Sequence, residues 1–366
     1  MGDVVSLVKS SQPYVRKKAV LALYKLFLRY PQGLRLAFDR LRQALMDPDP
    51  SVVTAAVNVI CELSRKNPKN YLALAPQLFQ LLSTSSNNWM LIKVVKLLGT
   101  LVPVEPRLAR KLLDPLATVI QNTPAKSLMY ECVSTVTQAL PYTVRSDGTQ
   151  AKNAPAVAAL CLQKLKEMVE DPDQNLKYLG LVGFWQLMRS HPRIVAAHRA
   201  LVMECLVDAD VTIRLRALDL VVGMVTRRNL VDVCRTLLEH VERSDGHYRE
   251  QLIQKLVFIC ARDKYKYLYP NFGWYLSVLV DLAYVRGSHG HLIASQMLDV
   301  CVRVSGIRGF AVRSVLPLLT DHRLAETCIA PGVSSVAAHA GSGVSAIAPA
   351  MSAGEDALMA AAAAGG

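Results

Sequence analysis

The feature that most constrains the fold is one amphipathic helical pattern that occurs eight times along the 366 residues. Apolar residues occupy the positions six and nine residues after the start of every copy, and the position twelve residues after it in all copies except the last, where Arg303 stands. Steps of three place these positions on one face of a helix. The copies begin at Tyr14, Ser51, Trp89, Ser127, Asn175, Thr212, His247 and His291.

A second amphipathic stretch lies between successive copies, for example at residues 33–46, 107–120, 156–169 and 231–241. The unit is therefore a helical hairpin of about 40 residues, which cannot bury its apolar face alone and must stack on its neighbours. Only 6% of the residues are aromatic, which also favours packed helices over a β-sandwich. We predict an all-α fold: a HEAT/armadillo-type α-solenoid of about eight hairpins, forming a curved rod.

Helix boundaries are marked by proline and aspartate. Pro31, Pro68, Pro106 and Pro192 each lie seventeen residues after the start of a copy, where proline would end the helix. The sequences Asp-Pro-Asp at 47–49 and 171–173 and Asp-Ala-Asp at 208–210 precede three copies and offer N-cap oxygens. We also expect the i,i+4 ion pairs Asp173–Lys177 and Asp210–Arg214 on the following helices. These charges are interpreted as parts of the repeat scaffold.

Composition divides the chain into a trunk at residues 1–322 and a tail at 323–366. The tail holds 15 Ala and 6 Gly among its 44 residues, without helical periodicity, and is expected to be disordered or aberrant. The trunk is expected to be truncated at both ends, because it lacks terminal repeats with a polar outer face. Residues 141–155 are predicted to form a polar loop between repeats.

The net charge of +13 favours acidic partners, and all of the excess lies in the trunk, since the tail has one basic and three acidic residues. Basic clusters near the helix ends are candidate contacts with acidic surfaces, although bases at helix C-termini also complement the helix dipole. The candidate residues are Arg16, Lys17, Lys18, Arg65, Lys66, Lys69, Arg107, Arg110 and Lys111, with a further cluster at Arg262, Lys264 and Lys266.

Motifs for catalysis or cofactor binding are missing from the sequence. It contains no GxxxxGK[ST], HExxH or GxSxG, and its eight cysteines include no CxxC pair. We therefore predict a protein that is not an enzyme, needs no cofactor or metal, and uses its cysteines as small buried side chains. Trp89, Trp185 and Trp274 are interpreted as packing residues.

Several long segments of the trunk resemble the adaptins, the large subunits of heterotetrameric vesicle-coat adaptor complexes. DQNLKYLGL (173–181) and IRLRALDL (213–220) are similar to blocks shared by large adaptor subunits in general. VNVICELSRKNPKNY (57–71) and NNWMLIKVVKLLG (87–99) are similar to the delta type of the third adaptor complex. The resemblance extends from about Asp3 to about Leu319.

The resemblance implies a non-enzymatic scaffold that binds a sigma-type small chain, a mu-type medium chain and a beta-type large chain. It also implies a place on the cytosolic face of Golgi and endosomal membranes. From the basic clusters we expect peripheral contact with anionic membrane, and a small GTPase is a further expected partner. Cargo would be sorted to lysosomes and related organelles. No nucleic acid is expected among the partners.

Two other kinds of α-solenoid remain alternatives. The basic trunk also fits a nucleic-acid-binding protein, whose affinity would fall steeply with salt. RNA readers of one base per repeat need polar or stacking residues at fixed positions of successive helices, and the sequence has no such ladder. A karyopherin-type carrier, recognised by nucleotide-switched GTPase binding, is the third interpretation.

Overall fold

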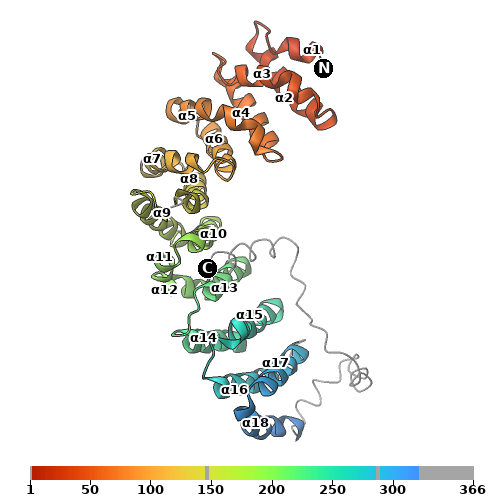
Figure 1. Cartoon of the computed structure of the whole chain (residues 1–366), viewed down its shortest axis with the longest axis vertical. Helices are drawn as coiled ribbons and strands as arrows, with labels where there is room; N and C mark the ends of the chain where they lie inside the picture. The colour runs from red at the N-terminus through yellow and green to blue at the C-terminus, as the bar shows by residue number, and fades with distance from the viewer. Residues whose placement is uncertain (1, 145–147, 286–288, 321–366) are drawn as a thin grey trace. The chain divides into compact units, whose positions relative to one another are not determined.

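The computed structural model describes residues 2–144, 148–285 and 289–320, and all regular structure in these ranges is helical (Figure 1). The described chain separates into two compact units, with unit 1 ending at Tyr269 and unit 2 beginning at Pro270. Both units lie largely within the predicted trunk, whereas the predicted tail at 323–366 lies outside the described residues. The all-α prediction is confirmed.

Each of the eight predicted helical copies is a helix, and each begins one residue before the first residue of the copy. We call these the aligned helices. They are α2 (Pro13–Arg29), α4 (Pro50–Ser64), α6 (Asn88–Leu101), α8 (Lys126–Ala139), α10 (Gln174–Ser190), α13 (Val211–Gly223) and α15 (Gly246–Tyr265) in unit 1, and α17 (Gly290–Arg303) in unit 2. In unit 1, each aligned helix packs directly on the next one.

The helices between them form the second layer of unit 1, and we call these the partner helices. They are α3 (Gly33–Ala44), α5 (Ala75–Thr84), α7 (Arg107–Asn122), α9 (Ala154–Val169), the short α11 (Pro192–Ala196) and α12 (Arg199–Glu204), and α14 (Leu230–Arg243). A short α1 (Gly2–Leu7) packs on α2, and the 3-10 turns η1 (Pro68–Leu74), η2 (Leu140–Thr143) and η3 (Cys205–Val207) complete the connections. Pairs such as α7 with α8 and α9 with α10 are the predicted helical hairpins.

The core of unit 1 follows the apolar columns of the repeat. The residues nine positions after each copy's start, from Leu23 in α2 to Leu256 in α15, are completely buried, and so is Val300 in unit 2. The residues six positions after the start are also completely buried in unit 1, whereas Met297 in unit 2 is half-buried. The repeat thus supplies a continuous apolar seam between aligned and partner helices.

Unit 2 contains α16 (Phe272–Ala283), α17, the turn η4 (Ser305–Ile307) and α18 (Arg308–Thr320). Helix α16 packs on both α17 and α18. Tyr275, Leu276 and Leu279 of α16 form the centre of its small core. Arg303, the exception in the sequence pattern, is exposed at the last position of α17.

Candidate interaction surface

The loops before three aligned helices are built around the predicted pairs of aspartates. The second aspartate caps the helix: its carboxylate accepts from the backbone N–H two residues on, at 2.8 Å from Asp49 to Ser51, 2.8 Å from Asp173 to Asn175 and 2.7 Å from Asp210 to Thr212. The predicted N-caps are therefore confirmed. The capping bonds satisfy N–H groups that the first turn of a helix otherwise leaves without partners.

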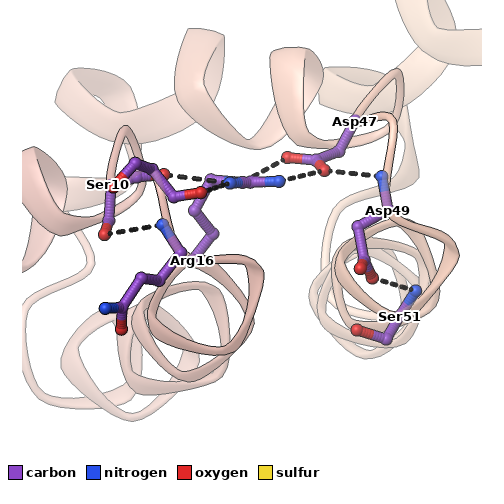
Figure 2. Close-up of polar contacts among 7 residues, drawn as sticks. Ser10, Arg16, Asp47, Asp49 and Ser51 are labelled. Carbon is purple, nitrogen blue, oxygen red and sulfur yellow. Dashed lines mark hydrogen bonds and ion pairs between the residues drawn. The ribbon is translucent and has the colours of Figure 1, made fainter.

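The first aspartate of each pair connects the loop to the preceding aligned helix. In the loop before α4, the Asp47 carboxylate accepts from the backbone N–H of Asp49 at 2.9 Å and from two nitrogens of Arg16, each at 2.8 Å (Figure 2). Arg16 also donates to the backbone carbonyls of Ser10 and Ser11. Four hydrogen bonds thus hold its guanidinium, and two of them join α2 to the loop before α4.

The same connection recurs further along the stack. Lys126 of α8 donates to Asp171 at 2.7 Å, and Lys177 of α10 donates to Asp208 at 2.7 Å. The predicted i,i+4 pair Asp173–Lys177 is therefore wrong, because the Lys177 ammonium is bound by the next loop. The pair Asp210–Arg214 is wrong too: the Arg214 guanidinium stacks on the ring of Tyr248 in α15, 4.6 Å from its centre.

These contacts shift the ionisation of the aspartates. The hydrogen bond from Arg16 holds the pKa of Asp47 below its usual value, and the hydrogen bond from Lys126 does the same to the pKa of Asp171. Burial alone would raise the pKa of Asp208, but the hydrogen bonds from Lys177 and from the backbone of Asp210 outweigh it and lower that pKa. All three groups are therefore carboxylates at neutral pH.

We expect unit 1 to lose stability in acid because of these aspartates. A carboxyl group whose pKa is lower in the folded state stabilises the fold above its ordinary pKa of about 3.9, and that contribution disappears as the pH falls through the folded value. The free energy of unfolding in urea should thus fall between about pH 5 and pH 2. Asp47→Asn should lower the free energy of unfolding at pH 7, and the free energy of unfolding of this variant should decrease less as the pH falls. Asp39→Asn, which removes an exposed carboxylate, controls for the change in net charge; an equal effect would contradict this account.

Charged side chains also pair across the exposed surface of the aligned helices. Lys93 of α6 lies 3.4 Å from Glu62 of α4, Lys96 lies 3.8 Å from Glu131 of α8, and Lys255 of α15 lies 3.0 Å from Asp219 of α13. Each pair joins one repeat to the next. These acids and bases therefore have a structural role between adjacent repeats.

The structure does not bring the nine candidate basic residues into one patch. Those at 16–18 lie near the start of α2, those at 65–69 follow the end of α4, and those at 107–111 lie in the first turns of α7. Arg65 pairs with Glu62, Arg107 lies 3.8 Å from Glu105, and Arg110 donates to the carbonyl of Thr143. Among the described residues, six of the nine form no ion pair: Lys17, Lys18, Lys66, Lys69, Arg110 and Lys111.

The expectation that Trp89 is a packing residue is wrong, because 79% of the residue is exposed. Trp89 is the second residue of α6, and the cap from Asn87 binds its backbone N–H at 3.1 Å. Trp89 is the first residue of its copy of the repeat. The other copies begin with Tyr14 or with a polar residue, and this position does not face the core. The polar residues at the same position of the other copies were the signal in the sequence that Trp89 is exposed. Large exposed aromatic residues are typical of protein interfaces.

The described cysteines are core residues, as predicted, apart from Cys301, which is half-exposed. Burial raises the pKa of both Cys132 and Cys161 to about 12, so these thiols are not reactive nucleophiles. Within the described ranges, no group of three or more His, Cys, Asp or Glu side chains could hold a metal ion. None of the described helices is long and apolar enough to cross a membrane.

A depression of about 360 Å³ lies beside the loop between α9 and α10. Its lining includes Asp171, Lys177, Cys205 and Asp208. The charged members already take part in the contacts between repeats described above, and burial raises the pKa of Cys205 to about 11. These side chains form a junction between repeats, and the Cys205 thiol stays protonated at neutral pH.

Comparison with known proteins agrees with this architecture. Residues 1–340 match the family model described as the adaptin N terminal region. The chain is 51% identical over 324 residues to the AP-3 complex subunit delta-1 of Bos taurus, covering 88% of this chain and 26% of that protein. It is 46% identical over 324 residues to the AP-3 complex subunit delta of Dictyostelium discoideum, covering 88% of this chain and 27% of that protein. The chain thus spans about a quarter of the length of these relatives.

A structural comparison finds a chain in a homology model of the full-length AP-3 complex in an intermediate open conformation. The TM-score is 0.60 at 29% sequence identity, with 89% of this chain and 60% of that chain covered. The similarity therefore extends over almost the whole chain in sequence and in fold. It agrees with the resemblance to the delta type seen in the sequence.

Proposed function

Since the chain belongs to the family of the adaptin N-terminal region, we propose that it is a non-enzymatic scaffold subunit of a vesicle-coat adaptor complex. The observation that carries the proposal is the 51% identity to an AP-3 delta subunit over 324 residues. The structure supports it with stacked helical hairpins joined by ion pairs from repeat to repeat, an arrangement that offers extended surface for binding.

The partners we propose are the other chains of such a complex: a sigma-type small chain, a mu-type medium chain and a beta-type large chain. A small GTPase is a further proposed partner. The complex would act on the cytosolic face of Golgi and endosomal membranes and sort cargo to lysosomes and related organelles. The likeness in fold to a chain of a full-length AP-3 complex supports assembly with other subunits.

Trp89 is the residue of the aligned helices that we expect to anchor a subunit partner. Trp89→Ala should weaken binding to a recombinant sigma-type chain by tenfold or more, because truncating a central interface tryptophan commonly costs about 2 kcal/mol or more. Circular dichroism should show the same helix content, since the side chain contributes little to the core.

The matched control is Leu36→Ala, which removes an equally exposed apolar side chain, also 79% exposed, from the partner helix α3. Isothermal titration calorimetry of both variants against the sigma-type chain provides the comparison. Unchanged affinity in Trp89→Ala would remove this residue from the interface, and no binding by the folded wild-type chain would contradict the proposed function itself.

Anionic membrane is proposed to contact the start of α2. Arg16 is bound by Asp47, so Lys17 and Lys18 are the residues available for this contact. Reversing both charges to glutamate should weaken binding to phosphatidylserine vesicles, since each basic residue near such a surface contributes about 1 kcal/mol. Cosedimentation measures the change. The double variant of Arg35 and Arg42 to glutamate, on α3, is the control, and an equal loss in both would show a general charge effect.

A further inference from the structure

A second basic surface lies where α13 and α15 end, and the proposed function does not account for it. We call it the 227–269 patch: Arg227 and Arg228 from the loop after α13, and Arg262, Lys264, Lys266, Tyr267 and Tyr269 from the end of α15 and the turn that follows. The segments 226–229 and 262–269 hold five bases and one acid, Asp263. The patch is therefore strongly positive.

The backbone at the end of α15 places this charge at the surface. Asp263, Lys264 and Tyr265 have φ values of 51°, 56° and 65°, so three successive residues with side chains adopt the left-handed conformation, which is disfavoured for L-residues. Tyr265 is buried and fixes the turn, while Lys264 and Lys266 on either side of it are exposed. The chain maintains a costly local conformation that directs two lysines into solvent.

Two arginines of the patch are oriented by aromatic rings. The Arg227 guanidinium carbon lies 5.9 Å from the centre of the Tyr269 ring, which joins the loop after α13 to the segment after α15. The Arg262 guanidinium carbon lies 5.6 Å from the centre of the Tyr267 ring. A guanidinium that is held on a ring keeps its N–H groups available along its edge. The rings thus hold both guanidinium groups in place, and each group carries paired N–H groups of the kind that match a planar anion.

Elsewhere on the aligned helices, bases such as Lys93, Lys177 and Lys255 pair with carboxylates of the adjacent repeat. In the 227–269 patch, the only ion pair among the described residues is that of Arg262 with Asp263, at 4.0 Å. The charge of the patch is therefore not needed to join repeats. It is complementary to an acidic surface outside this chain.

We propose that the 227–269 patch binds an acidic, extended peptide segment of a protein partner, with carboxylates on Arg227 and Arg262 and the lysines adding long-range attraction. Carboxylates match the paired N–H groups of a fixed guanidinium. Binding to a fluid layer of lipid headgroups would depend mainly on the number of positive charges, and the fixed orientation of the arginines would add little to its affinity. Tyr269, 61% exposed, would cover one side of the bound peptide. The inference is independent of the adaptor function proposed above.

The test is the binding of the full chain to a fluorescein-labelled twelve-residue peptide containing six consecutive glutamates, followed by fluorescence anisotropy at 50 and 150 mM salt. The double variant Arg227→Ala with Arg262→Ala should bind at least tenfold more weakly than the wild type. The double variant to lysine keeps the charge but loses the paired N–H groups, and should recover less than half of the lost binding free energy. The same peptide with glutamine in place of glutamate should not bind.

Arg35→Ala with Arg42→Ala removes two exposed arginines from α3 and is the matched control, which should retain wild-type affinity. Equal weakening in this control, full affinity in the lysine variant, or absence of peptide binding would each overturn the proposal. So would loss of binding to phosphatidylserine vesicles in the alanine variant with peptide binding unchanged, because the patch would then be a membrane contact. Circular dichroism of every variant verifies that the helices are intact.

Discussion

Phe184→Ala is expected to lower the free energy of unfolding of unit 1 by about 3–5 kcal/mol, the usual range for removing a fully buried aromatic ring. Phe184 is completely buried nine residues into the α10 copy, and its ring lies 6.2 Å from that of His198. Helix α10 packs on α8, α9 and α13. The cavity would therefore weaken the stack on both sides of the helix.

Urea unfolding followed by circular dichroism and by the fluorescence of Trp185, the next residue, measures the effect. The control is Phe258→Ala, which removes the same ring from the surface of α15, where 41% of the residue is exposed. It should cost clearly less, because about two fifths of the residue's area already faces water and is not lost from the core. Equal costs at the two positions would contradict the assignment of Phe184 to the core.

Gly180→Ala is the second substitution with a large expected effect, a loss of about 1–3 kcal/mol in the free energy of unfolding. A methyl group at Gly180 would lie 2.7 Å from Cγ2 of Val169 and only 3.0 Å from the backbone oxygen of Leu165, both in α9. A side chain can rotate away, but the backbone of α9 cannot move without separating the two helices. Gly180 therefore permits the close packing of α9 on α10.

Gly273→Ala is the matched control, since a methyl group there meets nothing within 4 Å. It should be neutral or stabilising by up to about 1 kcal/mol, because alanine is the better helix former. Urea unfolding of both variants provides the comparison. A neutral effect at Gly180 would show that α9 can move away from α10 at little cost, contrary to the tight packing seen in the structure.

The sequence predicted the helices and their buried faces well because both follow from one local period. The start of every aligned helix, from α2 to α17, lies within one residue of its prediction, and Leu98 and Val136 are buried where the columns place them. The caps at Asp49 and Asp210 were also predictable, because capping needs only an oxygen at the right position in the chain.

The partners of charged residues were not predictable in the same way. Lys177 is close in sequence to Asp173 on its own helix, but the stacking of repeats brings Asp208 to it instead. The left-handed turn at 263–265 and the boundary between the units after Tyr269 carry no signal in the helical period. These features depend on how one repeat meets the next, which a pattern within single helices does not specify.

The exposure of Trp89 shows that the aligned positions of the repeat predict which residues face solvent, in addition to where the helices lie. Its size favoured burial, whereas its column, with residues such as Ser51, Asn175 and Thr212, favoured the surface, and the column was right. At Trp89, the position in the period thus predicted exposure better than the residue type did, whereas at Arg303 the type was the better guide.

The most direct test of the central claim is affinity purification of the full chain from a eukaryotic cytosol at moderate salt. Bound proteins are identified by mass spectrometry, and bound nucleic acid by the ratio of absorbance at two wavelengths. An adaptor scaffold should recover sigma-type, mu-type and beta-type chains together, without nucleic acid. Recovery of nucleic acid with none of these chains would contradict the account and would favour the nucleic-acid-binding interpretation of the basic trunk.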